Sequence, residues 1–556
     1  MSTTELRSDS SATRAVAGAD WWRGAAIYQV YPRSFADQNG DGTGDLAGVR
    51  TRLPYLHDLG IDAIWFTPWY PSPMADGGYD VADYRAIDPL FGDLAEAERL
   101  ISEALELGIR TIIDVVPNHV SDQHAWFRAA LAAGPDSPER ERFWFREGRG
   151  EHGELPPNRW ESEFGGQAWS RVIGTDGVPE QWYLHLFAPG QPDLNWGHAD
   201  VLREHEEILR FWFDRGVCGI RIDSAALVAK DADLPEVADE HHPGKHPYVD
   251  RDELQGIYRS WRVIAESYGP ERVLIGEIWL PDAERFARYL RPDVLHSAFN
   301  FDFMAAPWDA TALRASIEQT LSVHAQVGAP ATWVLSNHDV TRPVTRYGRA
   351  DTSFAFDAKR FGTPTDLALG TRRARAAALL AMALPGAYYL YQGEELGLPE
   401  VEDLPLDVLD DPMHARSGGV DPGRDGCRIP LPWSGSRPPY GFSPDGRPVE
   451  TWLPQPADWA GFTAQAQAMD ATSMLSLYRD ALRLRRDLTD LGAGSLAWRD
   501  LGPGVLAFDR GDGFVSVTNF SEGPVELPTY DRIWLTTVPL EGGRLPSDAS
   551  AWLKHS

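Results

Sequence analysis

Residues 94–116, LAEAERLISEALELGIRTIIDVV, contain the unit from which most of this chain is built. The first part is an amphipathic stretch that ends in Gly108, and glycine commonly ends helices. The second part, RTIIDVV, is an apolar run with the length of a buried strand. A helix followed at once by a buried strand is the repeating unit of proteins with a parallel sheet.

The same unit recurs along the chain. Helix-like stretches at 46–60 and 252–269 also end in glycine. Short apolar runs predict eight buried strands: AIYQVY (26–31), DAIWFT (62–67), RTIIDVV (110–116), VCGIRID (217–223), VLIGEIW (273–279), LHSAFNF (295–301), ATWVLSN (331–337) and AYYLYQG (387–393). Eight such strands alternating with helices predict an α/β fold, a (β/α)8 TIM barrel, with a doubly wound open sheet as the alternative.

Two regions interrupt the alternation. Residues 119–192 are rich in Trp, Gly and Pro and are too long for a simple loop, which predicts an inserted B domain after strand 3. Residues 397–460 form a second irregular, Pro- and Asp-rich insertion. The amphipathic stretch 473–488 should be the last helix of the barrel.

These interruptions define the expected domains. The catalytic barrel should comprise residues 21–118 and 193–488. Residues 489–556 contain short alternating runs separated by turns, which predict a C-terminal antiparallel β domain. The polar residues 1–20 should form a mobile tail.

Composition excludes several classes of function. The 556 residues include 52 Lys and Arg against 82 Asp and Glu, a formal net charge of -30. Such a chain repels phosphate backbones and anionic lipids, so we expect neither a nucleic-acid nor a membrane partner. Two cysteines, Cys218 and Cys427, cannot build a disulfide scaffold. With no spanning segment and no secretory signal recognised, we expect a cytoplasmic protein, a monomer or a weak homo-oligomer.

Charged and polar residues stand where the predicted strands end. In a barrel, the chemistry lies at this C-terminal edge of the strands. Buried charges there are costly unless they are paired or functional. The residues in question are His119 in DVVPNH, Arg221 and Asp223 in GIRID, Glu277 in GEIW, and His338 and Asp339 in SNHD. Together they indicate a catalytic site.

These motifs carry a family resemblance. DVVPNH, GIRID, GEIW and SNHD, in this order, resemble the four conserved regions of the α-amylase superfamily, glycoside hydrolase family thirteen. QPDLNW (191–196) resembles the fifth region of its α-glucosidase and oligo-1,6-glucosidase branch. The resemblance covers nearly the whole chain and implies a retaining glycoside hydrolase of the α-glucosidase class, EC 3.2.1.20.

The resemblance also implies roles for three carboxyl groups. Cleaving an acetal with retention requires a carboxylate nucleophile and a second carboxyl that acts as acid and then base. By this resemblance Asp223 is the nucleophile, Glu277 is the acid and base, and Asp339 holds sugar hydroxyls. Arg221 would keep Asp223 ionised. His119 and His338 would bind hydroxyls of the same sugar.

A second set of residues should enclose the non-reducing sugar. MADGGYD (74–80) resembles the loop of the family in which an Asp and a Tyr do this, with Asp76 and Tyr79 as the matches. GRDGCRIPLPW (423–433) resembles the segment carrying an Arg that pairs with this Asp, with Arg428 as the match. That pair would end the pocket after one ring and give exo-action. Phe187 should line the same pocket.

The expected activity is release of α-glucose from the non-reducing end of maltose and short α-1,4-glucooligosaccharides. Ser224, beside the nucleophile, is small, and small residues at this place accompany α-1,4 activity in the resembled branch. Four alternatives remain open: an oligo-1,6-glucosidase, a sucrose- or trehalose-acting isomerase or transglycosylase, a non-catalytic family member that acts by protein association, and a TIM-barrel enzyme of other chemistry.

The stretch DQNGDGTGD (37–45) carries a metal-binding pattern. Asp37, Asn39, Asp41 and Asp45 alternate, as in the first nine positions of an EF-hand loop. The twelfth position is Gly48 rather than Glu, which excludes a calmodulin-type sensor. The stretch resembles the structural Ca²⁺ loop of the branch, with the Thr43 carbonyl as a further ligand. We expect structural Ca²⁺, with Mg²⁺ as the alternative, distant from the acid pair.

Overall fold

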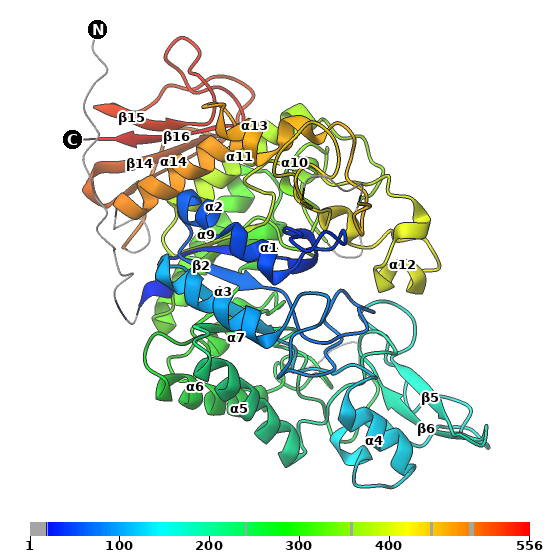
Figure 1. The fold of residues 1–556 in the computed structure, drawn as a ribbon. Helices are drawn as coiled ribbons and strands as arrows, with labels where there is room; N and C mark the ends of the chain where they lie inside the picture. Colours follow the sequence, from blue (N-terminus) through cyan, green and yellow to red (C-terminus); the bar gives the residue numbers. More distant parts are fainter. Residues whose placement is uncertain are drawn as a thin grey trace.

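The computed structural model describes residues 18, 20–238, 242–355, 360–444, 449–488 and 494–555. The expected mobile tail, 1–20, lies outside the described residues except for Gly18 and Asp20. A central barrel separates two smaller β regions, which lie at opposite ends of the molecule (Figure 1). No helix in the described part of the chain is long and apolar enough to cross a membrane.

An eight-stranded parallel sheet forms the barrel. Its strands are β1 (Ala26–Val30), β2 (Ala63–Phe66), β3 (Arg110–Val115), β7 (Gly219–Ile222), β8 (Val273–Gly276), β9 (Ser297–Ala298), β10 (Thr332–Val334) and β11 (Ala387–Tyr391). They pair in the order β10-β11-β1-β2-β3-β7-β8-β9. The Thr332 hydroxyl donates to the Ala298 carbonyl at 2.5 Å and joins the two end strands. The TIM barrel is therefore confirmed, and the open doubly wound sheet is wrong.

Helices surround this sheet. The main ones are α1 (Leu46–Thr51), α2 (Leu53–Leu59), α3 (Leu94–Glu106), α5 (Ala199–Asp214), α6 (Leu254–Ser267), α7 (Ala283–Tyr289), α8 (Phe301–Ala305), α9 (Ala310–Val327), α10 (Pro343–Tyr347), α11 (Leu367–Ala383) and α14 (Met474–Asp487). Helix α3 begins where the Asp93 carboxylate accepts the Glu96 amide at 2.8 Å, and it buries Leu100 and Ile101. Helix α2 ends at Gly60, whose φ of +99° suits a residue without Cβ.

The insertion after β3 is a small domain with an aromatic core. It contains α4 (Ala125–Ala133) and an antiparallel sheet of β4 (Phe145–Arg146), β6 (Pro179–Leu184) and β5 (Trp169–Ile173), in that order. Trp144, Trp160, Trp169 and Trp182 pack together in its core. This packing explains the abundance of Trp in the segment 119–192.

The C-terminal domain is an antiparallel sheet, as predicted. Its strands are β12 (Ala497–Arg499), β13 (Val505–Arg510), β14 (Phe514–Asn519), β16 (Ala549–Lys554) and β15 (Arg532–Thr536), in spatial order. The Trp552 indole donates to the Leu379 carbonyl of α11 at 3.0 Å and fastens the sheet to the barrel. The irregular region 397–460 contains α12 (Pro412–Arg416), and α13 (Ala464–Ala468) follows it.

Candidate active site

A cavity of about 340 Å³ lies where the barrel strands end. It is lined by Asp76, Tyr79, His119, Glu163, Phe164, Phe187, Asp223, Ser224, Ala226, Leu227, Val249, Glu277, Trp279, His338, Asp339, Met413 and Arg424. Every predicted catalytic or sugar-binding residue lines this cavity except Arg221 and Arg428. Those two arginines are buried and bond to residues of the cavity wall.

The sheet places Asp223 and Glu277 side by side. The Asp223 amide donates to Val115 and the Glu277 amide donates to Ile222, each at 2.9 Å, so both residues extend the parallel ladder by one step. Arg221 holds the two carboxyl groups with its two terminal nitrogens. Nη1 lies 2.7 Å from Asp223 Oδ1 and Nη2 lies 2.8 Å from Glu277 Oε2.

A third carboxyl completes this cluster. Asp114 lies 3.3 Å from Arg221 Nη1 and accepts the Tyr79 hydroxyl at 2.7 Å. Burial raises the pKa of Asp114 to about 7, against the opposing effect of Arg221. Burial, and next the Glu277 carboxyl, raises the pKa of Asp223, while Arg221 opposes the shift. Burial therefore favours the protonated forms of Asp114 and Asp223, and Arg221 opposes this effect at both carboxyls. The motif DVVPNH contained Asp114, but the sequence reasoning assigned it no role.

Two donors orient the Glu277 carboxyl. The Ser224 amide donates to Oε2 at 2.9 Å, and the Trp279 indole donates to Oε1 at 3.2 Å. Ser224 has a φ of +45°, an uncommon conformation for a residue other than glycine. The Trp279 ring stacks on Phe301 with the centroids 3.6 Å apart and the planes 3° from parallel. Trp279 stands in the quoted motif GEIW, yet sequence reasoning missed it.

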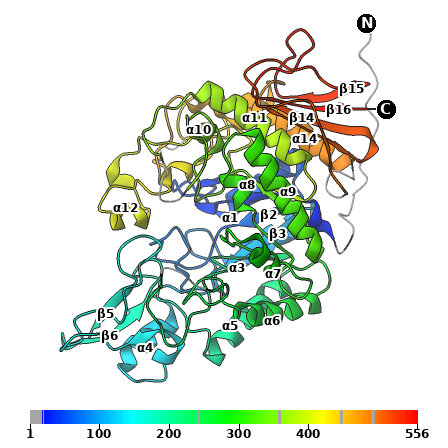
Figure 2. The same cartoon turned by 180° about the vertical axis from the view of Figure 1, so that it is seen from behind.

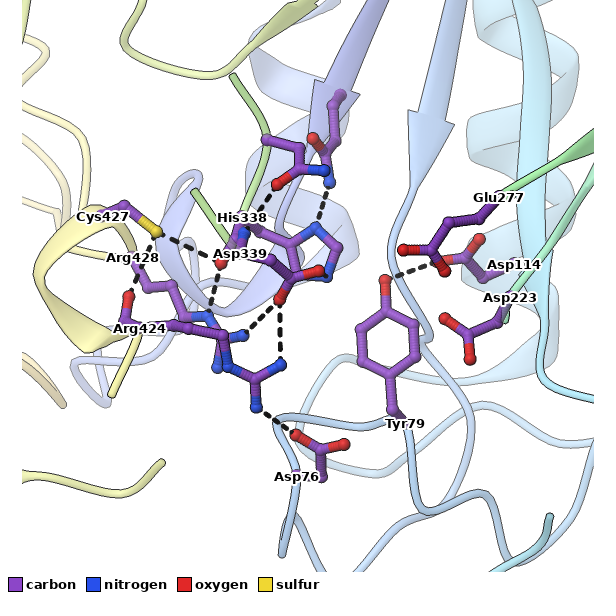
Figure 3. A network of polar contacts seen from close by, with 12 residues as sticks. Asp76, Tyr79, Asp114, Asp223, Glu277, His338, Asp339, Arg424, Cys427 and Arg428 are labelled. Carbon is purple, nitrogen blue, oxygen red and sulfur yellow. Dashed lines mark hydrogen bonds and ion pairs between the residues drawn. The ribbon is translucent and has the colours of Figure 1, made fainter. Parts of the chain in front are cut away.

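Asp339 lies in a separate cluster of charges, which Figure 3 shows on the other side of Tyr79 from Asp223 and Glu277. Arg424 Nη1 and Arg428 Nη2 both lie 3.0 Å from Asp339 Oδ1. Burial lowers the pKa of His338 to about 3, so His338 is neutral at pH 7. Burial alone would raise the pKa of Asp339, but its neighbours hold it well below the ordinary value. With His338 neutral, Arg424, Arg428 and then Arg221 are the cations responsible.

The expected pairing of Asp76 with Arg428 is wrong, because Asp76 pairs with Arg424. Arg424 Nη2 lies 2.6 Å from Asp76 Oδ1, whereas Arg428 Nε donates to the His338 carbonyl at 2.9 Å (Figure 3). The 3-10 turn Asp425–Cys427 separates the two arginines, so that both reach Asp339 but only Arg424 extends to Asp76. Asp411 fixes Arg424 by accepting its Nε at 2.5 Å. Arg424 was visible in the quoted segment 423–433.

The remaining predicted residues form the wall next to Asp76. The Tyr79 ring stacks on His338 at 5.2 Å with an interplanar angle of 3°. His119 Nε2 lies 3.0 Å from Gln191 Nε2, and Gln191 donates to Asp76 at 2.9 Å. Burial lowers the pKa of His119 to about 3, so this ring is neutral as well. Phe187 contacts His119 with centroids 5.0 Å apart. Gln191 was missed, although it begins the motif QPDLNW.

The loop 37–45 is tied together by its own backbone amides. Asp37 accepts the amides of Gly40 at 2.6 Å and Gly42 at 2.9 Å. Asp45 accepts the amides of Gly48, Gln38 and Asn39. A carboxylate oxygen can accept a hydrogen bond and still bind a metal ion, and oxygen atoms are the ligands that Ca²⁺ prefers. Among the described residues, however, no three His, Cys, Asp or Glu side chains gather as a metal-binding group. The metal therefore stays a prediction.

Known proteins resemble the chain over nearly its full length. A family model described as "Alpha amylase, catalytic domain" matches residues 29–494. A probable α-glucosidase of Rhizobium meliloti is 35% identical, with 94% of this chain and 93% of that protein covered. A trehalose-6-phosphate hydrolase of Escherichia coli is also 35% identical, with 87% and 86% covered. The crystal structure of an α-glucosyl transfer enzyme has a TM-score of 0.81 and 35% identity, with 96% and 99% covered.

Proposed function

The chain belongs to the α-amylase family, and from that premise we propose that it is a retaining, exo-acting α-glucosidase for maltose and short α-1,4-glucooligosaccharides. The observation that carries the proposal is that one guanidinium, that of Arg221, forms ion pairs with both Asp223 and Glu277. Two carboxyls held by the two terminal nitrogens of one side chain are close neighbours. This favours the separation of about 5–5.5 Å at which one carboxylate attacks the sugar directly.

In the first step, Asp223 attacks the anomeric carbon while Glu277 gives its proton to the glycosidic oxygen. The bond to the leaving sugar breaks, and a glycosyl ester forms on Asp223. Arg221 favours the ionised form of the nucleophile.

In the second step, a water molecule enters where the leaving sugar was. Glu277 takes a proton from that water, which attacks the anomeric carbon and releases α-glucose from Asp223. Asp339, kept anionic by Arg424 and Arg428, stabilises positive charge that develops on the ring. The neutral rings of His119 and His338 can bind hydroxyls without adding a cation beside that charge.

Exo-action is supported by the buried pair of Asp76 and Arg424. Asp76 is 4% exposed and is also bonded to Gln191, so the pair is a fixed wall of the cavity. A chain extended beyond the non-reducing ring would have to break these charge-assisted bonds. The pair would therefore hold the terminal hydroxyls and limit the pocket to one ring on that side.

A second candidate is transfer of the glucosyl unit to another sugar, which the likeness to the α-glucosyl transfer enzyme favours. Isomaltose-, sucrose- and trehalose-acting enzymes use the same ester intermediate, whereas a non-catalytic relative would need none of these acids. Initial rates of glucose release from maltose, isomaltose, sucrose and trehalose test the choice, with transfer products scored in parallel. Preference for any substrate other than maltose, or transfer exceeding hydrolysis, would contradict the proposal.

Three accompanying properties are also proposals. Structural Ca²⁺ or Mg²⁺ at residues 37–45 is supported by the oxygen donors of that loop. A cytoplasmic location is supported by the two cysteines, Cys218 and Cys427, which are buried and free. A monomer or weak homo-oligomer is expected, and light scattering at several concentrations checks it.

A further inference from the structure

One carboxylate of the cavity has no part in the proposed reaction. Glu163 comes from the inserted domain, where its amide donates to the Leu186 carbonyl at 2.7 Å. The preceding Ser162 hydroxyl donates to the Phe187 carbonyl at 2.8 Å. Phe164, the next residue, packs edge-on against Phe187 with centroids 5.3 Å apart. Both neighbours of Glu163 are therefore fixed to the wall of the cavity.

Glu163 lies at the mouth rather than at the floor. Its side chain lines the cavity and is exposed, whereas Asp76, Asp223 and Glu277 are at most 7% exposed. Helix α12 contributes Met413 to the same cavity, and Arg416 of that helix donates to the carbonyls of Gly165 and Gln167. Figures 1 and 2 both show α12 on the same side of the barrel as β5 and β6. Glu163 thus borders the side by which the leaving or accepting sugar passes.

The charge of Glu163 is uncompensated. Its carboxylate forms no hydrogen bond or ion pair with any residue that the structure describes, and no cation is among the groups that shift its pKa. Arg424 is the one guanidinium or ammonium group among the described residues that line the cavity. Its nitrogens are already bonded to three other carboxylates. Arg416 donates from one terminal nitrogen to the two backbone carbonyls at the rim, and it does not line the cavity.

We propose that Glu163 determines specificity at the mouth of this cavity, by making it accept uncharged glucosides and reject sugars that carry a phosphate on the leaving ring. This inference rests on the proposed glucosidase function and adds the substrate class. Repulsion between like charges about 4 Å apart weakens binding roughly fivefold in water and by far more at lower dielectric. A phosphate dianion entering beside Glu163 meets this repulsion and finds no available cation in the described lining.

The test compares maltose with maltose that carries a 6-phosphate on its reducing ring. We expect wild type to show at least a roughly tenfold higher kcat/KM for the neutral sugar, and Glu163→Gln to narrow that ratio at least about fivefold, since the phosphate carries up to two charges. Glu161→Gln is the matched control, because Glu161 is exposed on the same loop but does not line the cavity. That control should leave the ratio unchanged.

The outcomes separate this inference from the proposed function. Equal kcat/KM values for the two sugars in wild type, or an equal change of the ratio in both variants, would overturn the role of Glu163 while leaving the glucosidase intact. If neither maltose nor its 6-phosphate were cleaved, the proposed function would be contradicted instead. In that case, calorimetric dissociation constants of the two sugars for Asp223→Asn and Asp223→Asn/Glu163→Gln decide the inference. Equal discrimination by these two variants would refute it.

Discussion

Replacing Arg424 with lysine tests the charge cluster that encloses the non-reducing sugar. Arg424 reaches Asp76 at 2.6 Å, Asp339 at 3.0 Å and Asp411 at 2.5 Å, each from a different nitrogen. Lysine keeps the positive charge, but its single ammonium group cannot bridge three carboxylates in the planar geometry of a guanidinium. The substitution therefore removes bonds while preserving net charge.

The magnitude follows from the bonds that are lost. A hydrogen bond to a charged group contributes about 1.5–3 kcal/mol. If the new ammonium group is to stay bonded to the fully buried Asp411, the bonds to Asp76 and Asp339 are weakened. Losing the equivalent of one such bond predicts a fall in kcat/KM for maltose of roughly ten- to 150-fold. The acidic limb of the pH profile of kcat/KM should also move. Arg424 helps to hold the pKa of Asp339 low, so a weaker contact between residue 424 and Asp339 raises that pKa. As the pH falls, the variant should therefore lose activity at a higher pH than wild type.

The assay is the pH profile of kcat/KM for maltose, with the melting temperature as a check on folding. Arg483→Lys is the control, because the one ion pair of Arg483 with another described residue is the exposed pair with Asp480. A folded Arg424→Lys enzyme within about threefold of wild type, with an unmoved acidic limb, would refute the reasoning.

Three further predictions concern the rest of the molecule. Chelation of divalent metal should lower the melting temperature but leave initial activity at low temperature nearly unchanged, because metal bound at 37–45 stabilises only the folded state; no shift and no metal by elemental analysis would remove that site. Wild type should prefer maltose over isomaltose, and Ser224→Val should reduce kcat/KM more for maltose than for isomaltose. Because Ser224 has a φ of +45°, which disfavours a β-branched residue, the variant should also melt at a lower temperature than wild type. Equal slowing of both substrates would contradict the linkage argument. Trp279→Phe keeps an aromatic ring against Phe301 but removes the indole donor to Glu277, so kcat for maltose should fall several-fold; an unchanged kcat would make the indole bond irrelevant.

The sequence was most informative where chemistry coincides with strand ends. Hydrophobic period and run length identified the eight strands. In a closed parallel barrel the C-terminal ends of all strands lie at the same face. Asp223 and Glu277 therefore meet as expected, since each directly extends its strand. Arg221, one residue inside the end of β7, reaches both of them.

The sequence was least informative where loops supply the site. Arg424 and Arg428 are separated by a short turn, and only that turn decides which one reaches Asp76. Glu163 and Met413 come from distant segments of the chain, with no periodicity to relate them. Long-range loop contacts of this kind depend on packing rather than on local pattern. Trp279 stood within a recognised motif, but its hydrogen bond to Glu277 depends on a rotamer that sequence does not reveal.

The central claim is that Asp223 forms a covalent bond to glucose during turnover. A fluorinated glucosyl fluoride, whose ester intermediate hydrolyses slowly, should trap that state, and proteolysis followed by mass spectrometry locates the label. We predict one added fluoroglucosyl group per chain, on the peptide that contains Asp223, and no label in Asp223→Asn. A label on any other residue, or β-glucose as the first product of maltose with no label at all, would contradict the claim.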